Sequence, residues 1–409
     1  MRSLLLIIFL LFNGLVFSQV SGSAADKKDS ENKSAEAEDS EQDTIIIESR
    51  KESAVRSEKS VKGRELKPKQ KALNRAYESE NELEETNSEA QSTEFKNAAI
   101  SFEYSKERSE IQRTQRSPSA RQQAEMDDAV GFFEENSPNS FEFNYFKYSA
   151  GNHNLDLYPN LNEAERLRPN NSDVQIQLTA YHIIAGNKEE ATNYMNKLVA
   201  SNRLEANVLK YSGDILRSVP LNGTLITHGF DDTYGVWYMQ QVKGVRRDVK
   251  LVSLDFLQSP QYRTLLSKSG YVLPELQTIN TEYLSAFCGL NRKMKLAISL
   301  TTPKEYFKSI MENVYVTGLV FEYHSMAYDN FQRNVGLWDD ELKKELVGGV
   351  NDEKAKQLSA NYLPMLLQMR KVYKQEGDLK KVSELDKFID RVAVQCKKYD
   401  QVQHLKRMY

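Results

Sequence analysis

The sequence predicts a mixed α+β and α/β fold, in which pairs of helices flank a small, mostly parallel four-stranded α/β domain. Three observations lead to this prediction. Short β-prone runs alternate with helical stretches between residues 218 and 325, an order typical of a sheet with helical cover. Helix–turn–helix units with a glycine in the turn occur on both sides of that region. A long, highly charged segment precedes all of them.

Residues 1–18 are predicted to be a signal peptide. Arg2 supplies the positive charge, residues 4–12 are a continuous apolar run, and the residues up to Ser18 offer a cleavage site. The run is short for a bilayer span, so a signal anchor is the less favoured alternative. No later segment has the apolar length of a membrane helix. We therefore expect an exported chain without a transmembrane segment, periplasmic or outer-membrane-associated in a Gram-negative bacterium.

The charge and cysteine content argue against several classes of partner and cofactor. The formal net charge is −3, which gives no overall electrostatic case for nucleic acid. Cys288 and Cys396 lie far apart in the sequence, with no metal-ligand spacing, so we expect two free thiols. Their pairing in an oxidising compartment is the alternative. No cofactor is expected.

Residues 19–117 are predicted to be a disordered charged linker. The segment is rich in Glu, Lys, Ser, Asp and Gln and has few large apolar side chains. Such a composition buries too little surface to offset the entropy lost on ordering. The β-prone patch at residues 44–48 either adds a strand to a partner's sheet or has no role.

Residues 118–217 are predicted to be a helical repeat domain. Residues 145–169 and 174–198 each read as helix, turn, helix, and the turn glycines Gly151 and Gly186 are 35 residues apart. This pattern resembles tetratricopeptide repeats, whose helix pairs stack because no single pair buries its apolar face alone. Gly377 marks a similar turn in residues 326–409, which are predicted to form a C-terminal helical repeat region.

The α/β domain is predicted over residues 218–325. Its four expected strands lie at residues 224–227, 249–254, 295–300 and 314–322. A helix follows the first strand, and Lys243-Gly244 ends it with a cation and a glycine.

The turn after the first strand carries a resemblance to a known family. Residues 227–234, 237–240 and 244–249 are similar to the soluble C-terminal part of bacterial multi-spanning membrane proteins related to protein O-mannosyltransferases. The likeness continues through residues 295–299 and 317–321 and into the C-terminal helix pair. His228 and Phe230 depart from the family's pattern, which has Asn and Asp there. The resemblance implies the fold of this region and an accessory role in glycosylation, because transferase chemistry belongs to the membrane part.

The candidate ligand-binding residues follow the first two strands, where open α/β sheets bind ligands. They are His228, Asp231, Asp232, Thr233 and Asp255. Carboxylates with a histidine suit a divalent cation or a sugar hydroxyl. The alternative, which we favour, is that the aspartates only cap the helix. Tyr234, Trp237 and Tyr238 share a helix face and are expected in the core, although they would also stack on a sugar.

No motif in the sequence specifies a reaction. A Gly-rich phosphate loop, a nucleophile elbow and a Cys–His motif are all missing from it. We therefore predict a non-enzymatic exported protein-interaction module with tetratricopeptide-like repeats, bound to a protein or a glycan at the cell envelope. The alternative is a glycan- or metal-binding accessory subunit of an envelope glycosylation system. An enzyme would require His228, Asp231 and Asp232 to converge on one cleft.

Overall fold

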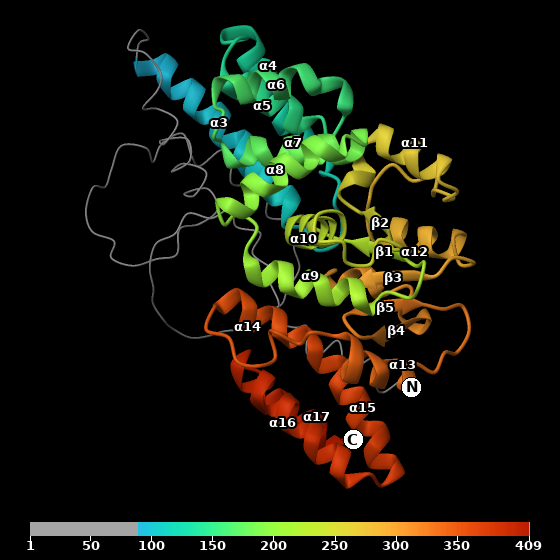
Figure 1. Cartoon of the computed structure of the whole chain (residues 1–409). Coiled ribbons are helices and arrows are strands. Elements are labelled where there is room, and N and C mark those ends of the chain that lie inside the picture. The colour runs from blue at the N-terminus through green and yellow to red at the C-terminus, as the bar shows by residue number, and fades with distance from the viewer. Residues whose placement is uncertain (1–88, 409) are drawn as a thin grey trace, which may run out of the picture.

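The computed structural model describes residues 89–408, which form a small sheet between two groups of helices (Figure 1). The predicted signal peptide (residues 1–18), the β-prone patch and most of the predicted charged linker lie outside the described residues. The helices are α3 (Glu89–Glu110), α4 (Ala120–Asn136), α5 (Phe141–Ala150), α6 (Tyr158–Leu167), α7 (Ser172–Ala185), α8 (Lys188–Ala200), α9 (Ala206–Ser218), α10 (Phe230–Gln241), α11 (Pro260–Lys268), α12 (Thr281–Leu290), α13 (Phe331–Gly336), α14 (Glu353–Ser359), α15 (Leu363–Glu376), α16 (Leu379–Gln395) and α17 (Tyr399–Met408).

The sheet has five strands in the order β2-β1-β3-β5-β4. The strands are β1 (Thr224–Thr227), β2 (Lys250–Ser253), β3 (Leu296–Ser299), β4 (Val314–Thr317) and β5 (Val320–Tyr323). β1 pairs in parallel with β2 on one side and with β3 on the other, whereas β5 runs antiparallel to both β3 and β4. β1 and β3 are buried along their whole length, which explains their continuous apolar character.

The prediction of four mostly parallel strands is wrong at its last strand. Residues 314–322, expected as one strand, begin a hairpin in which Gly318 and Leu319 form the turn between β4 and β5. Gly318 has φ +59°, a conformation that glycine adopts without the steric cost of a Cβ. A Cβ there would also lie 2.2 Å from the hydroxyl of Ser218. The sheet is therefore mixed, with two parallel and two antiparallel pairings.

Side chains form hydrogen bonds with backbone groups of both outer strands of the sheet, β2 and β4. The Tyr262 hydroxyl accepts from the amide of Ser253 at 3.2 Å and donates to the carbonyl of Leu251 at 3.3 Å, both on β2. On β4, the side-chain amides of Asn330 and Asn334 donate to the carbonyl of Val316. Exposed strand edges invite pairing with another chain, and these contacts block that mode of association at the groups they occupy.

α3 lies within the segment predicted to be disordered, so that prediction is wrong for residues 89–117. Phe95, Ala98, Ala99 and Phe102 recur at helical spacing and pack with α4 and α5. Phe102 is fully buried and stacks on Phe146 with ring centroids 4.0 Å apart. This short apolar stripe is sufficient to dock the helix, although the surrounding composition is highly charged.

Residues 111–118 form a strap that leads from α3 to α4 and lies against the loop before α12. The amide of Arg116 donates to the carbonyl of Ile279 at 2.6 Å, and the amide of Thr281 donates to the carbonyl of Thr114 at 3.1 Å. The Ser117 hydroxyl accepts from the amide of Ile279 at 2.9 Å. The strap thus fixes the N-terminal helices to the α/β domain.

Helix pairs form at the turns that the glycines mark. α7 and α8 meet at Gly186 (φ +78°), and α15 and α16 meet at Gly377 (φ +77°), both in the left-handed conformation. Between α5 and α6, Gly151 has φ −75° and the left-handed residues are Asn152 and His153. The helical hairpins are therefore present, and their assignment as tetratricopeptide repeats stays a prediction.

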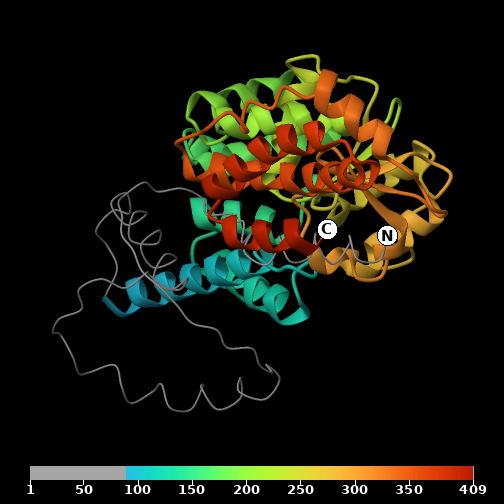
Figure 2. The ribbon, with the colours of Figure 1, turned by 90° about the horizontal axis from the view of Figure 1, so that it is seen from below.

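The C-terminal helices attach to α9 and α10 through charged side chains. Asp214 on α9 is 1% exposed and accepts from the amides of Lys343 and Lys344 and from the hydroxyl of Tyr362 at 2.7 to 2.9 Å. Seen from below, these helices lie across the front of the molecule (Figure 2).

Cys288 and Cys396 are free. Within residues 89–408, no helix combines the length and apolar character that crossing a bilayer requires.

The docking of α3 predicts a specific loss of stability. Phe102→Ala should lower the free energy of unfolding by about 3–5 kcal/mol, because it removes a buried aromatic ring and leaves a cavity. The control is Ile111→Ala, since Ile111 is 47% exposed, and its effect should stay within about 0.5 kcal/mol. Urea denaturation of the full chain measures both. Equal effects of the two substitutions would contradict the docking of α3.

Candidate functional site

A pocket of about 130 Å³ lies beyond the carboxyl ends of β1 and β2. One wall comes from the start of α10 and from the residues that follow β2. The opposite wall comes from α3, the strap, α5 and α7, and Arg203 from the α8–α9 loop completes it. Ligands of open α/β sheets bind at this edge, so the pocket has the position that the fold favours. The N-terminal helices supply most of its lining.

Asp255 and Arg116 form a buried ion pair in this pocket. Asp255 lies two residues after the end of β2, and its carboxylate accepts from Arg116 Nε at 2.6 Å and from Arg116 Nη2 at 2.5 Å. The amide of Gly229 donates to the same carboxylate at 2.6 Å, and Arg116 Nη1 donates to the carbonyl of Glu110 at 2.6 Å. Burial disfavours the charge on Asp255, but the charge and hydrogen bond of Arg116, the nearby His228 and the amide of Gly229 together outweigh it, so the pKa of Asp255 lies below its ordinary value.

Glycine at position 229 makes this arrangement possible. Gly229 precedes α10 with φ +80° and ψ 174°, a conformation that side-chain-bearing residues rarely adopt. In this conformation its amide points at Asp255, and the chain enters α10 immediately after β1. The backbone conformation at the start of α10 therefore explains why position 229 is a glycine.

Two neutral histidines flank the ion pair. The imidazole of His153 packs edge-on against Phe256, with ring centroids 5.4 Å apart, and His228 packs in the same way against Tyr306 at 5.6 Å. Burial lowers the pKa of His153 to about 4, with Lys106 adding to the effect, and lowers the pKa of His228 to about 3. His153 Nδ1 and His228 Nε2 are buried and have no hydrogen-bond partner within the described part of the chain.

The remaining walls of the pocket combine aromatic rings with charges. The guanidinium of Arg203 lies 4.6 Å from the centroid of the Phe230 ring, and Phe230 in turn contacts Tyr234 at 4.6 Å. Carboxylates outnumber cations in the lining. The acidic side chains are Glu103, Glu107, Glu110, Asp173 and Asp255, and the basic ones are Lys106, Arg116 and Arg203. The pocket therefore carries a negative balance.

Of the five residues that the sequence indicates, the pocket is lined by Thr233 and Asp255. The Thr233 hydroxyl lies 2.9 Å from that of Thr227 and 3.2 Å from that of Ser253, which ties α10 to β1 and β2. His228 borders the Arg116–Asp255 pair without lining the pocket. Tyr234 lines the pocket and donates to the carbonyl of Ile176 at 3.0 Å.

Asp231 and Asp232 point away from the pocket and from each other. Asp231 pairs with Lys354 on α14 at 2.8 Å, which joins α10 to the C-terminal helices. Asp232 is buried and accepts from the amide of His228 at 3.0 Å and from the hydroxyl of Ser299 at 2.9 Å. Both aspartates lie in the first turn of α10, whose N-cap is Gly229, and the helix dipole favours carboxylates there. His228, Asp231 and Asp232 thus do not converge on one cleft, whereas the contact of Asp232 with the backbone amide just before the helix is consistent with the capping interpretation.

Trp237 and Tyr238 are 9% and 5% exposed and belong to the main core, so they do not face the pocket. Residues 89–408 contain no group of three or more His, Cys, Asp or Glu side chains arranged to hold a metal. Sequence reasoning missed the lining residues that precede α9, above all Arg116 on the strap, His153 in the loop after α5 and Arg203 in the α8–α9 loop. Glu103, Glu107 and Glu110 share one face of α3, and this spacing was the available signal for a polar wall.

The pKa of Asp232 predicts how stability depends on pH. Burial raises its pKa from 3.8 to about 7, so between these values the folded protein binds more protons than the unfolded chain. The contribution of Asp232 to the free energy of unfolding therefore falls as pH rises through this window. Burial lowers the pKa values of His153 and His228, so their contribution to the free energy of unfolding rises with pH below pH 6.5. Asp232→Asn removes the contribution that falls with pH. The free energy of unfolding of this variant should therefore rise more steeply with pH than that of the wild-type chain.

Urea denaturation at several pH values between 4 and 7 measures this slope. The control is Asp128→Asn, which removes one carboxylate from the exposed side of α4. A slope for Asp232→Asn that matches the slope of the wild-type chain would contradict the assignment.

The comparisons with known proteins identify a domain over about half of the chain. Residues 208–403 match the model of TMEM260-associated domain 2, a domain named after a membrane protein family. The match includes the sheet, α10 and the C-terminal helices, and leaves α3 to α8 outside. No curated protein and no solved structure matches the chain. The pocket is thus lined partly by the matched domain and partly by helices outside it.

Proposed function

We propose that this chain is a non-enzymatic binding module whose pocket holds a sugar residue of an envelope glycan. The observation that carries the proposal is the composition of the pocket. Aromatic rings and paired charged groups line a single cavity at the ligand-binding edge of an α/β sheet. Glycan binding is part of the alternative that the sequence offers, a glycan- or metal-binding accessory subunit, and the pocket lining supports that part.

The lining suits a polyhydroxylated ring. Carboxylates accept hydrogen bonds from hydroxyls, and the guanidinium of Arg203 supplies donors to sugar oxygens. Phe230 and Tyr234 offer apolar surface for the C–H faces of the ring. The surplus of carboxylates would repel an acidic sugar, so the ligand should be neutral.

Binding rather than catalysis is supported by the positions of the ionisable groups. Asp231 and Asp232 are committed to Lys354 and to Ser299, outside the pocket. Asp255, which lines the pocket, is held ionised by Arg116 and does not offer a proton at neutral pH.

The other expectations from the sequence stay predictions. A protein partner on the helix pairs is one of them, and the capped groups on β2 and β4 argue against strand addition as its mode of binding. A role as an accessory subunit of a glycosylation system rests on the resemblance to proteins related to protein O-mannosyltransferases. Export and residence at the cell envelope rest on residues 1–18.

The sugar proposal predicts selective binding that depends on Arg203. The full chain, titrated with maltotriose and cellotriose by ligand-observed NMR and calorimetry, should bind a neutral trisaccharide in preference to a trigalacturonate. Arg203→Met should weaken this binding by about tenfold or more, because a charged hydrogen bond contributes about 1.5–3 kcal/mol. The control is Arg391→Met, since Arg391 also lies over an aromatic ring, that of Phe388, but on α16. Equal affinities for both variants, or preference for the acidic sugar, would contradict the proposal.

A further inference from the structure

The three parallel strands begin at one edge of the sheet, opposite the pocket. Thr224 pairs with Lys250 on one side and with Leu296 on the other, so the strand starts are level. Three segments meet there, residues 219–223, 243–250 and 290–295. Together they are called the amino edge.

The amino edge concentrates positive charge in a chain whose net charge is −3. The exposed cations are Lys243, Arg247, Lys250, Arg292, Lys293 and Lys295. The acidic residue within these segments is Asp248, and it is bound to Arg246. Helix dipoles explain part of the pattern, because α10 and α12 end here and favour nearby cations. The dipoles do not explain Lys250, the first residue of β2, or the exposed Leu221.

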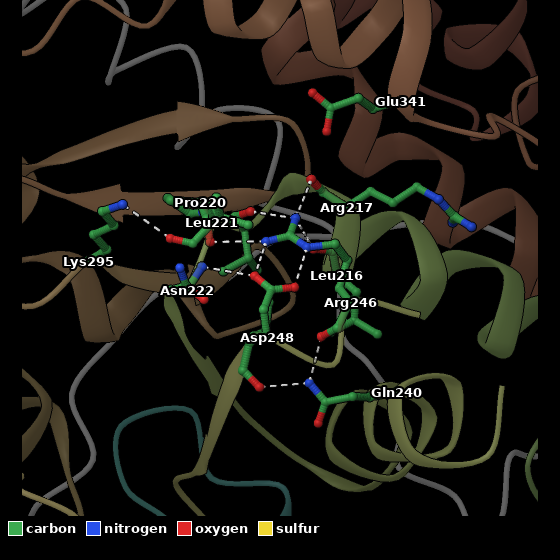
Figure 3. A network of polar contacts seen from close by, with 12 residues as sticks. Leu216, Arg217, Pro220, Leu221, Asn222, Gln240, Arg246, Asp248, Lys295 and Glu341 are labelled. Atoms are coloured by element: carbon green, nitrogen blue, oxygen red, sulfur yellow. Dashed lines mark hydrogen bonds and ion pairs between the residues drawn. The ribbon is translucent and has the colours of Figure 1, made fainter. Parts of the chain in front are cut away.

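A rigid turn presents Leu221 in the middle of these cations. Arg246 donates to the carbonyl of Val219 at 2.8 Å and to that of Pro220 at 3.1 Å, and it pairs with Asp248 at 2.8 Å (Figure 3). Asp248 accepts from the amide of Asn222 at 2.8 Å. The hydrogen bonds from Arg246 hold the pKa of Asp248 well below its ordinary value. The ion pair between Arg246 and Asp248 therefore persists in acid.

The exposure of Leu221 has no role within the fold. Its side chain is 66% exposed, and its carbonyl accepts from Lys295 Nζ at 3.1 Å (Figure 3). Leu290, at the end of α12, is 48% exposed. A leucine held at the tip of an ordered turn and surrounded by cations suits a partner that is apolar inside and anionic at its surface.

We propose that the amino edge docks on the surface of an anionic lipid bilayer. The lysines and arginines meet the phosphates and carboxylates of the headgroups, and Leu221 enters the boundary between headgroups and acyl chains. Nucleic acid offers the same phosphates but no apolar layer for Leu221 to enter, and an exposed aromatic platform for bases is missing from these three segments. Because the pocket lies at the opposite edge of the same strands, docking leaves it facing away from the membrane.

Vesicle sedimentation tests the proposal. The full chain should sediment with vesicles of equimolar phosphatidylcholine and phosphatidylserine more than with pure phosphatidylcholine, and salt of about 1 M should abolish the difference. Lys250→Gln/Lys293→Gln should weaken binding by about fivefold for each cation removed. Leu221→Ser should weaken it by about tenfold or more without any change in charge. Residues 1–18 are identical in all variants, so the differences report on the amino edge.

The matched control is Lys380→Gln/Lys387→Gln, which removes two exposed lysines from α16 and should bind the vesicles as the wild-type chain does. All variants should keep the wild-type urea midpoint, because the changed side chains are exposed. Equal weakening by the control pair would overturn the proposal. It would also be overturned if Leu221→Ser had no effect, or if duplex DNA bound as tightly as the anionic vesicles.

Discussion

The ion pair between Arg116 and Asp255 is the contact on which the rest of the described structure depends. It joins the strap, which follows α3, to the carboxyl end of β2 across 139 positions of sequence. Both side chains are largely withdrawn from water, with exposed fractions of 5% and 14%. Removing charges from water is costly, and such a pair is stable only when further hydrogen bonds satisfy it. The carbonyl of Glu110 and the amide of Gly229 provide them.

The ion pair also makes the pocket. Without the strap, the carboxyl edge of β1 and β2 would be an open surface formed by α10 and Phe256. With it, α3 and α5 lie opposite that surface and contribute the acidic face of α3, Tyr145 and His153. The matched domain over residues 208–403 therefore supplies one half of the pocket, and the helices before it supply the other. On the proposed function, residues outside the matched domain therefore contribute to the choice of ligand. The basic amino edge, by contrast, belongs wholly to the matched domain.

The parts of the fold that local sequence determines were predicted. The strands at residues 224–227, 250–253 and 296–299 are short apolar runs bounded by turns, and Asp255 was placed correctly at the end of the second. Local signals were also overlooked. Gly318 interrupts a β-prone run, as hairpin turns do, and the Phe95 to Phe102 stripe has helical spacing within a charged segment.

The composition of the candidate site could not be predicted from local pattern. Arg116 lies in a polar stretch, and nothing near it indicates that its partner is Asp255. The same holds for Asp231, whose partner Lys354 is on α14. Two adjacent aspartates in one turn suggested a shared task. They instead point to different layers, because successive residues in the first turn of a helix face different directions.

A double-mutant cycle on Arg116→Met and Asp255→Asn tests this account most directly. Each single substitution leaves an uncompensated buried partner and should lower the free energy of unfolding by about 3–5 kcal/mol. The double variant removes both charges, so it should lose clearly less than the combined losses of the two single variants. If the effects of the two substitutions instead add to within about 0.5 kcal/mol, the ion pair does not hold the N-terminal helices to the sheet.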